Sequence, residues 1–248
     1  MATGKKPGKS VAKQPQPVAL TAESLAGVEA FGGLGVADRG RIASLCQGRR
    51  YDAGQRILSQ EDEARDVHFI VSGRIRVTIY SVNGREITFR DQGAGEMFGE
   101  LGAIDGAPRS AHVVALEDSL LACMPRERFW EVLRGYPRVA EFTFVRLVKL
   151  VRLLSERVFE FSSLAVRNRI HAELLRLARE NMHDDNVAII APAPTHADIA
   201  SRISTHREAV TREYQLLSEA GVIEPGRGRV VIRDVARLES MVREVTGR

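Results

Sequence analysis

The spacing of apolar residues changes at Pro137, and this change separates parts of the chain that must fold differently. Over residues 74–79, apolar and polar side chains alternate, which is the period of a half-buried strand. After Pro137 the apolar residues recur at intervals of three and four: Phe144, Leu147, Val151, Leu154, Val158 and Phe161. That spacing gives a continuous apolar face on a helix longer than two heptads. The sequence therefore predicts a β domain followed by a long helix that packs on a partner helix, with packing on its own domain as the alternative.

Residues 25–136 carry the pattern of short strands. Asn83-Gly84 is a hairpin-turn signal, and beyond it Ile87 and Phe89 continue the alternation against their polar neighbours. Further strands are expected at 67–71, 112–116 and 120–124. Short strands at regular spacing predict a small β-barrel or a jelly-roll-like β-roll.

Length and composition exclude several classes of protein. At 248 residues the chain has room for about two domains, and no apolar run approaches the ~18 residues of a membrane span. The two cysteines, Cys46 and Cys123, are too few for a four-cysteine iron–sulfur cluster and fit a reducing cytoplasm. Neither a nucleophile–base signature nor a metal-ligand spacing occurs, so we expect neither an enzyme nor a metal site.

Residues 1–24 are predicted to be a disordered basic tail, because Lys, Pro, Gly and Gln predominate at its start. The whole chain has a net charge of +4 and a pI near 9.3, which is a weak sign of a polyanionic partner. A solvated tail is favoured over a tail that contacts DNA.

The run from Phe98 to Ala111, FGELGAIDGAPRSA, contains the groups needed to bind a cyclic phosphate diester beside a ribose. Gly99 lets a ligand approach the backbone, and Glu100 can accept a hydrogen bond from a sugar hydroxyl. The residues that follow can form one helical turn whose free N–H groups attract an anion. Arg109 matches two phosphate oxygens, and Ser110 adds a hydroxyl. An ordinary surface loop is the alternative, which the ordered combination of these residues disfavours.

Residues 195–214, THADIASRISTHREAVTREY, have the pattern of two helices joined by a tight turn. Thr195 is predicted to cap the first helix, and Asp198 places negative charge in its first turn. Thr205 is expected to cap a second helix over about 206–220. This is a helix-turn-helix pattern, in which the second helix enters the major groove of DNA.

Arg207, Glu208 and Arg212 lie in the first two turns of that second helix. In the major groove, Arg can donate to guanine O6 and N7 and Glu can accept from cytosine N4, each pair contributing ~1–3 kcal/mol of discrimination. The alternative is a surface salt bridge between Glu208 and Arg212, worth ~0.3–0.5 kcal/mol. The helix-turn-helix context favours DNA.

The 98–111 run resembles the phosphate-binding cassette of cyclic-nucleotide-binding domains. The run from His206 to Arg212 resembles the recognition helix of the family of the cyclic-AMP receptor protein and the fumarate–nitrate reduction regulator. The resemblance covers nearly the whole chain. It implies an α+β fold, with a β-roll cyclic-nucleotide-binding domain over 25–136, a dimerisation helix over 137–163 and a winged helix-turn-helix domain over 164–248. The implied partners are double-stranded DNA, a second copy of the chain and RNA polymerase, and the implied effector is cyclic GMP or cyclic AMP.

The resemblance also implies site residues. The nucleotide site comprises Gly99, Glu100, Leu101, Arg109, Ser110, Phe89, Arg90, Leu154 and Ser155. The DNA site comprises Thr205, His206, Arg207, Glu208, Arg212 and, on a wing hairpin, Arg227. Arg207, Glu208 and Arg212 match the residues that read a TGTGA-like half-site. The chain departs from the family's receptor protein at His206, where that protein has Ser, and at Ser204, which replaces a turn glycine.

The base of the effector is predicted from three positions. The receptor protein of the family contacts adenine through adjacent Thr and Ser on the long helix, where this chain has Leu154 and Ser155. Arg90 and Ser110 fall where cyclic-GMP-dependent kinases, which the domain resembles, have a guanine-contacting Arg and Thr. Because adenine lacks the O6 that Arg can bind, cyclic GMP is favoured over cyclic AMP. The alternatives are a solvated Arg90 and a Leu154 that serves only to pack.

Within the same fold, the alternative function is a regulator that is independent of ligand or senses gas or redox state through haem. Haem would need an axial residue, for which His68 and His112 are the candidates. Each histidine is better explained as an ordinary strand residue.

Overall fold

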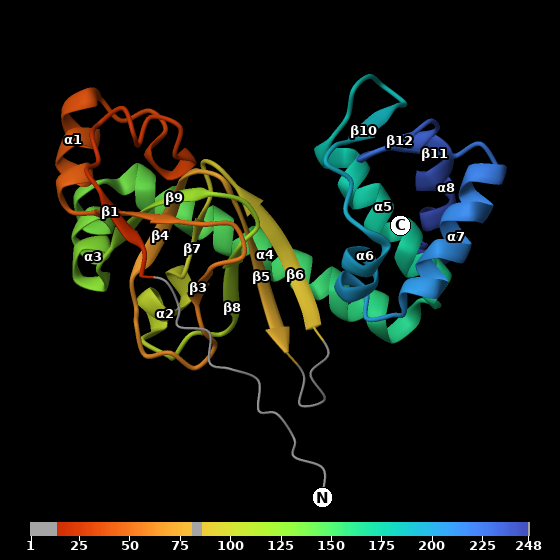
Figure 1. The fold of residues 1–248 in the computed structure, drawn as a ribbon, viewed down its shortest axis with the longest axis horizontal. Helices are drawn as coiled ribbons and strands as arrows, with labels where there is room; N and C mark the ends of the chain where they lie inside the picture. Colours follow the sequence, from red (N-terminus) through yellow and green to blue (C-terminus); the bar gives the residue numbers. More distant parts are fainter. Residues whose placement is uncertain (1–13, 81–85, 248) are drawn as a thin grey trace, which may run out of the picture. The chain divides into compact units, whose positions relative to one another are not determined.

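The computed structural model describes residues 14–80 and 86–247. The chain divides into two compact units, one formed by residues 1–79 with 89–145 and the other by 80–88 with 146–248. The first unit is built mainly of strands and the second mainly of helices (Figure 1). This architecture confirms the predicted α+β class, with a β-roll, a long helix and a C-terminal winged helix-turn-helix.

Two sheets of antiparallel strands form the β-roll. The first has the order β1 (Gln16–Val18), β2 (Gln47–Tyr51), β9 (Ser119–Met124), β4 (Val67–Ser72) and β7 (Met97–Phe98). The second has the order β3 (Arg56–Leu58), β8 (His112–Ala115), β5 (Arg74–Tyr80) and β6 (Glu86–Gly93). Apolar side chains from both sheets meet in one cluster that includes Ile70, Ile75, Val113 and Leu121.

Helices cover part of the roll. They are the 3-10 turn η1 (Glu29–Phe31), α1 (Val36–Ser44), the short α2 (Glu100–Asp105) and α3 (Arg126–Gly135). A second core cluster joins Phe31 and Phe69, whose ring centroids are 4.7 Å apart, to Phe129 of α3. The helical turn expected after Gly99 is therefore present as α2, whereas α1 and α3 were not predicted.

The N-terminal boundary of the ordered chain needs correction. Gln16–Val18 form strand β1, which pairs with β2, and Leu25 is fully buried. The predicted disordered tail over 1–24 therefore wrongly includes the residues from Gln16 onward. Backbone pairing to β2 orders them, and this contribution is invisible in their composition.

The outward face of strand β6 was also assigned wrongly. Thr88 is 2% exposed and Phe89 is 38% exposed, the reverse of the predicted alternation. The backbone N–H of Thr88 donates to the hydroxyl of Ser201 at 3.0 Å, so a polar contact buries the threonine. The predicted Asn83-Gly84 turn lies outside the described residues.

Helix α4 (Pro137–Ser163) is the predicted long helix. Its apolar face is exposed in the single chain, with Phe144, Val151 and Val158 each more than 60% accessible and Leu147 half-buried. An exposed stripe of this length indicates a partner surface. No helix among the described residues is both long and apolar enough to cross a membrane.

The second unit contains α5 (Val166–Glu180), α6 (His196–Arg202), α7 (Arg207–Glu219) and α8 (Val235–Thr246). A three-stranded sheet, in the order β10 (Ala188–Ile190), β12 (Arg229–Ile232) and β11 (Ile223–Gly226), completes it. Ile170, Leu174, Ile199, Val210 and Leu217 are in its core. Helix α8 was not predicted, although Val235 and Leu238 have helical spacing and Asp234 caps the helix.

Candidate functional site

Gly99 occupies a position that no other residue can fill without strain. It is the N-cap of α2, with φ of +83°, a left-handed conformation that favours glycine. A Cβ atom added there would lie 2.7 Å from Nη1 of Arg109 and 2.8 Å from the carbonyl oxygen of Asp66. The absence of a side chain therefore lets the guanidinium of Arg109 reach the backbone at the start of α2.

Arg109 is buried, with 4% of its surface exposed. Its Nη1 donates to the carbonyl of Gly99 at 3.0 Å and its Nη2 to the carbonyl of Asp66 at 2.7 Å. Its buried Nε has no hydrogen-bond partner within the described chain. Burial lowers the pKa of Arg109, and the nearby carboxylates of Asp66, Asp62 and Glu100 oppose that shift. The structure thus holds a positive charge, with one unused donor, beside the loop predicted to bind phosphate.

The other residues of the predicted cassette lie on and after α2. Glu100 is buried in the first turn of α2, whereas Leu101 and Ser110 are exposed. Because Gly99, Glu100 and Arg109 meet within one unit, the structure brings together the residues predicted to bind phosphate and ribose.

The residues predicted to read the base belong to different units. Phe89 and the half-buried Arg90 lie on β6 in the first unit. Leu154 and Ser155 are exposed on α4 in the second unit, and the Ser155 hydroxyl donates to the carbonyl of Val151 at 2.9 Å. Their role toward a base stays a prediction.

The two histidines considered as haem ligands are engaged inside the β-roll. The ring of His68 is 2% exposed and stacks on Phe98, with centroids 4.8 Å apart. Burial, with Arg109 and Arg49 nearby, lowers the pKa of His68 to about 3, so the ring is neutral. His112 Nδ1 accepts the backbone N–H of Gln60 at 3.2 Å. These contacts are consistent with the prediction that both histidines are ordinary strand residues. No three His, Cys, Asp or Glu residues gather as metal ligands in the described chain.

The first helix of the helix-turn-helix begins with the predicted cap. The Thr195 hydroxyl accepts the backbone N–H of Asp198, whose carboxylate accepts the backbone N–H of Thr195. At the turn, Ser204 has φ of +54°, which explains why a glycine is expected at this position. The Ser204 departure therefore leaves the turn intact at some cost in backbone strain.

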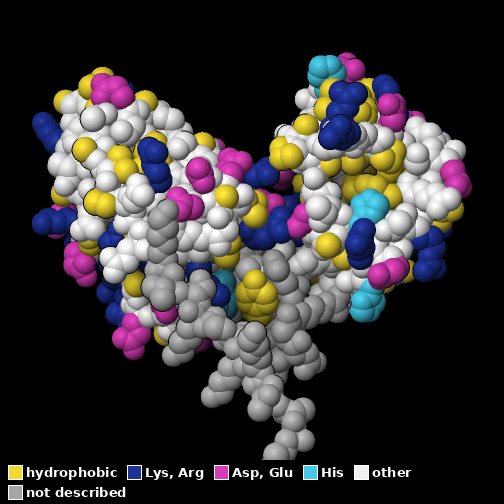
Figure 2. Space-filling view, viewed as in Figure 1, with side chains coloured by type: hydrophobic (Ala, Val, Ile, Leu, Met, Phe, Trp, Pro, Cys, Tyr) yellow, Lys and Arg dark blue, Asp and Glu magenta, His cyan; other side chains and the backbone are white. Residues whose placement is uncertain are grey.

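The second helix presents the predicted DNA-reading face. Arg207, Glu208 and Arg212 are exposed on α7, and they form no ion pair with one another among the described residues. His196 Nδ1 lies 2.8 Å from the hydroxyl of Thr211 and joins α6 to α7. Figure 2 shows histidine and basic side chains on the surface around these two helices. The predicted capping role of Thr205 is wrong, because α7 starts at Arg207 and His206 is its N-cap.

The predicted wing hairpin is confirmed as strands β11 and β12. Arg227 and Gly228 form its tip, and Arg227 is exposed. The described geometry therefore places Arg227 where it is free of the unit's core, as a phosphate contact would require.

Comparison with known proteins identifies the family. Residues 48–136 match the cyclic nucleotide-binding domain, and residues 168–241 match the Crp-like helix-turn-helix domain. The chain is 31% identical over 215 residues to the cyclic AMP receptor protein of Thermus thermophilus, covering 85% of this chain and 95% of that one. The chain belongs to the CRP/FNR family of transcription regulators. As a CRP/FNR-family protein it is a DNA-binding transcription regulator with a cyclic nucleotide-binding domain, not an enzyme.

More distant relatives agree. The CRP/FNR-family chain is 24% identical over 191 residues to the cAMP-activated global transcriptional regulator CRP of Haemophilus influenzae, covering 75% of this chain and 84% of that one. A mutant of CooA from Carboxydothermus hydrogenoformans has the same fold, with a TM-score of 0.74 at 17% identity, covering 92% and 98% of the two chains. FixK2 from Bradyrhizobium japonicum gives a TM-score of 0.67 at 18% identity, covering 79% and 96%.

Sequence reasoning missed two groups of residues in this regulator. Arg126 and Trp130 of α3 both donate to the carbonyl of Ala103 in α2. Glu173, on the buried face of α5, pairs with three arginines. The helical spacing of Phe129 and Val132 was a signal for α3, but no sequence signal identifies the acceptor or the ion partners.

Proposed function

We propose that this regulator is a homodimer whose effector is cyclic GMP in preference to cyclic AMP. Binding of the effector shifts the dimer to a form that recognises a pseudo-palindromic operator in the cytoplasm. The observation that carries the proposal is the buried guanidinium of Arg109, held beside Gly99 at the start of α2. A cyclic phosphate approaching there gains charge-assisted hydrogen bonds in a site largely shielded from water.

The homodimer is supported by the apolar face of α4. Its side chains keep heptad spacing and are mostly exposed in the single chain. Burying them against the same face of a second α4 removes that apolar surface from water. A symmetric dimer also presents two recognition helices, which must lie ~34 Å apart to enter successive major grooves. On DNA such a dimer contacts RNA polymerase.

Cyclic GMP is proposed from the residues that differ from those of the cyclic-AMP receptor proteins. The Thermus relative is a cyclic AMP receptor protein. In this chain, Leu154 offers no hydroxyl to adenine, while Arg90 can donate to guanine O6 and N7. The alternative effector is cyclic AMP.

A ligand-independent regulator is the second candidate, and one observation favours it. Both Nη atoms of Arg109 already donate to backbone carbonyls of the chain. A phosphate must therefore replace or share these contacts. A titration that detects no binding of either nucleotide would favour this candidate.

The proposed coupling predicts that cyclic nucleotide strengthens DNA binding. We expect saturating cyclic GMP to raise affinity for a TGTGA-type palindrome at least tenfold, the ~1.4 kcal/mol of a modest allosteric coupling. Fluorescence anisotropy at one fixed salt concentration measures it, because phosphate contacts make affinity depend on salt. A palindrome with scrambled half-sites is the control. Unchanged affinity on addition of either nucleotide would contradict the proposal.

The base preference predicts a selective effect of Arg90→Ala. Because a hydrogen bond to a charged group contributes ~1.5–3 kcal/mol, we expect the variant to bind cyclic GMP at least tenfold more weakly and cyclic AMP almost unchanged. Calorimetric titration of both nucleotides into both proteins makes the measurement. The exposed Arg50→Ala on β2 is the matched control. Equal affinities that Arg90→Ala does not change would remove the base-reading role.

A further inference from the structure

We propose that Arg126 and Trp130 of α3 are positioning residues for the cyclic nucleotide, holding α2 in place through the carbonyl of Ala103. The inference rests on the proposed nucleotide site at α2. It extends that site to a helix that contributes no predicted ligand contact.

The short helix α2 needs contacts from outside to hold it in place. We call the two hydrogen bonds from Arg126 and Trp130 to the Ala103 carbonyl the clamp. The helix has six residues, too few to be stable alone, and its last carbonyls have no partner within the helix. Ala103 O accepts Nε of Arg126 at 2.8 Å and Nε1 of Trp130 at 3.1 Å. An arginine that donates to a carbonyl near a helix C-terminus also stabilises the helix, because its positive charge lies at the negative end of the helix dipole.

A continuous hydrogen-bonded path joins this clamp to the guanidinium predicted to bind phosphate. The Ala103 N–H donates to the carbonyl of Gly99 at 3.4 Å, and that same carbonyl accepts Nη1 of Arg109 at 3.0 Å. Because the N–H and the carbonyl of Ala103 are both hydrogen-bonded, we expect a displacement of α2 at Gly99 to change the contact between Ala103 and the indole of Trp130. Phosphate binding at Arg109 is therefore linked to the position of α3.

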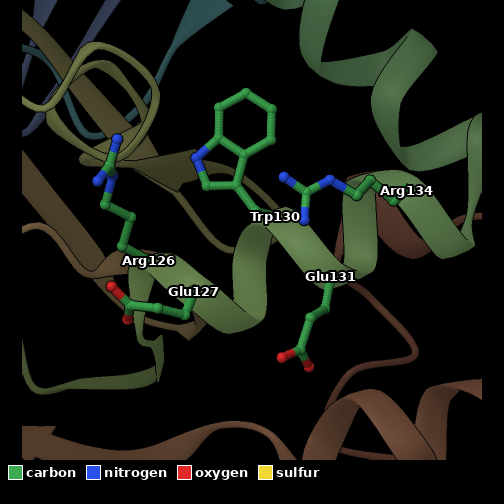
Figure 3. Close-up of a pocket in the computed structure, with 5 residues that line it drawn as sticks. All are labelled: Arg126, Glu127, Trp130, Glu131 and Arg134. Atoms are coloured by element: carbon green, nitrogen blue, oxygen red, sulfur yellow. The ribbon is translucent and has the colours of Figure 1, made fainter.

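The surroundings of Trp130 make it a reporter of this link. The indole lies between the guanidinium groups of Arg126 and Arg134, and Glu127 and Glu131 point to the other side (Figure 3). The Arg134 guanidinium is 5.7 Å from the ring centroid, and these five residues line an open cavity of about 430 Å³. Trp130 is the only tryptophan of the chain, so its emission reports this site alone.

The experiment combines fluorescence and calorimetry on the full chain. Saturating cyclic GMP or cyclic AMP is expected to shift or quench the Trp130 emission of the wild-type protein. The same nucleotide should leave the emission of Arg109→Leu unchanged, because that variant lacks the phosphate-binding end of the path.

Variants then separate positioning from simple stability. Arg126→Met and Trp130→Phe each keep the apolar body of the side chain and remove one donor to Ala103. We expect each to weaken nucleotide binding about threefold and the double variant at least thirtyfold, since either donor alone holds the carbonyl. Arg134→Met is the matched control, because it alters the other side of the indole. Arg134 forms no hydrogen bond or ion pair with α2 among the described residues, so this variant should bind nucleotide within twofold of wild type. Melting temperatures without nucleotide should differ little between the double variant and this control.

The outcomes are distinguishable. One outcome overturns the inference and leaves the proposed function standing: wild type binds nucleotide tightly without a change in its Trp130 emission, and the double variant binds with full affinity. Equal losses of affinity in Arg134→Met and the double variant also overturn it. Failure of wild type to bind either nucleotide overturns the proposed function and the inference together.

Discussion

Replacing Arg109 with leucine is expected to abolish measurable binding of cyclic GMP and of cyclic AMP. The side chain supplies a buried positive charge, and its Nη atoms donate to the carbonyls of Gly99 and Asp66 beside the segment predicted to bind phosphate. Loss of two charge-assisted hydrogen bonds, each ~1.5–3 kcal/mol, weakens binding at least a hundredfold. Calorimetric titration measures the loss, and DNA binding by the variant should no longer respond to nucleotide.

Two further variants make this result interpretable. Arg109→Lys keeps the charge without the planar fork and should retain a small part of the affinity. Arg50→Ala removes an exposed arginine from the same unit and should bind like wild type. Because leucine leaves the carbonyls of Gly99 and Asp66 without their donors, circular dichroism must first show that the variant is folded. A folded Arg109→Leu that binds nucleotide with wild-type affinity would refute the proposed site.

Replacing Glu173 with glutamine is expected to destabilise the second unit by about 3–5 kcal/mol, the effect of removing one partner of a buried ion pair. The Glu173 carboxylate is 2% exposed and lies 2.8 Å from Arg157 of α4 and 3.2 Å from Arg202 of α6. Arg176 of α5 also pairs with it. Without this charge, Arg157 and Arg176 keep the carboxylate of Glu160 as a partner, and Arg202 loses its ion pair with α5.

The pH dependence of this effect has a definite sign. Burial alone would raise the pKa of Glu173, but Arg157, Arg176 and Arg202 outweigh burial and hold the pKa below its ordinary value of 4.5. A depressed pKa contributes stability that is present above the ordinary value and lost as the pH falls through the folded value. The difference between wild type and Glu173→Gln should therefore narrow below pH 4.5. Burial raises the pKa of Glu160, so the contribution of Glu160 to stability decreases as the pH rises, opposite to that of Glu173.

Denaturant unfolding measures the loss of stability in Glu173→Gln. All samples are kept at one protein concentration, because the stability of a dimer depends on concentration. Glu244→Gln, an exposed glutamate on α8 in the same unit, is the control and should change the free energy of unfolding by less than about 0.5 kcal/mol. Equal stabilities of Glu173→Gln and wild type at neutral pH would show that the ion pairs only offset the cost of burying the charges.

The sequence was sufficient for features that depend on local chemistry. The heptad spacing after Pro137 predicted α4, and the Thr195-to-Asp198 spacing predicted the cap of α6. Gly99 and Arg109, ten residues apart, were predicted to serve the same phosphate-binding segment, and the structure places them in contact. In each case the interacting groups lie close in the chain or repeat at a fixed period, so a short window of sequence contains both partners.

Other features were decided only when distant segments came together. Gln16–Val18 became a strand because β2 offered an unpaired edge, and Thr88 became buried because Ser201 supplied a hydroxyl. Glu173 obtained partners from three helices, and Ala103 obtained its donors from α3, more than twenty residues away. A residue's propensity is intrinsic to the chain, whereas the partner that satisfies a buried polar group exists only after folding. Sequence therefore determined the family, the long helix, the helix-turn-helix and the segment predicted to bind phosphate, and tertiary structure alone decided which side chains hold them in place.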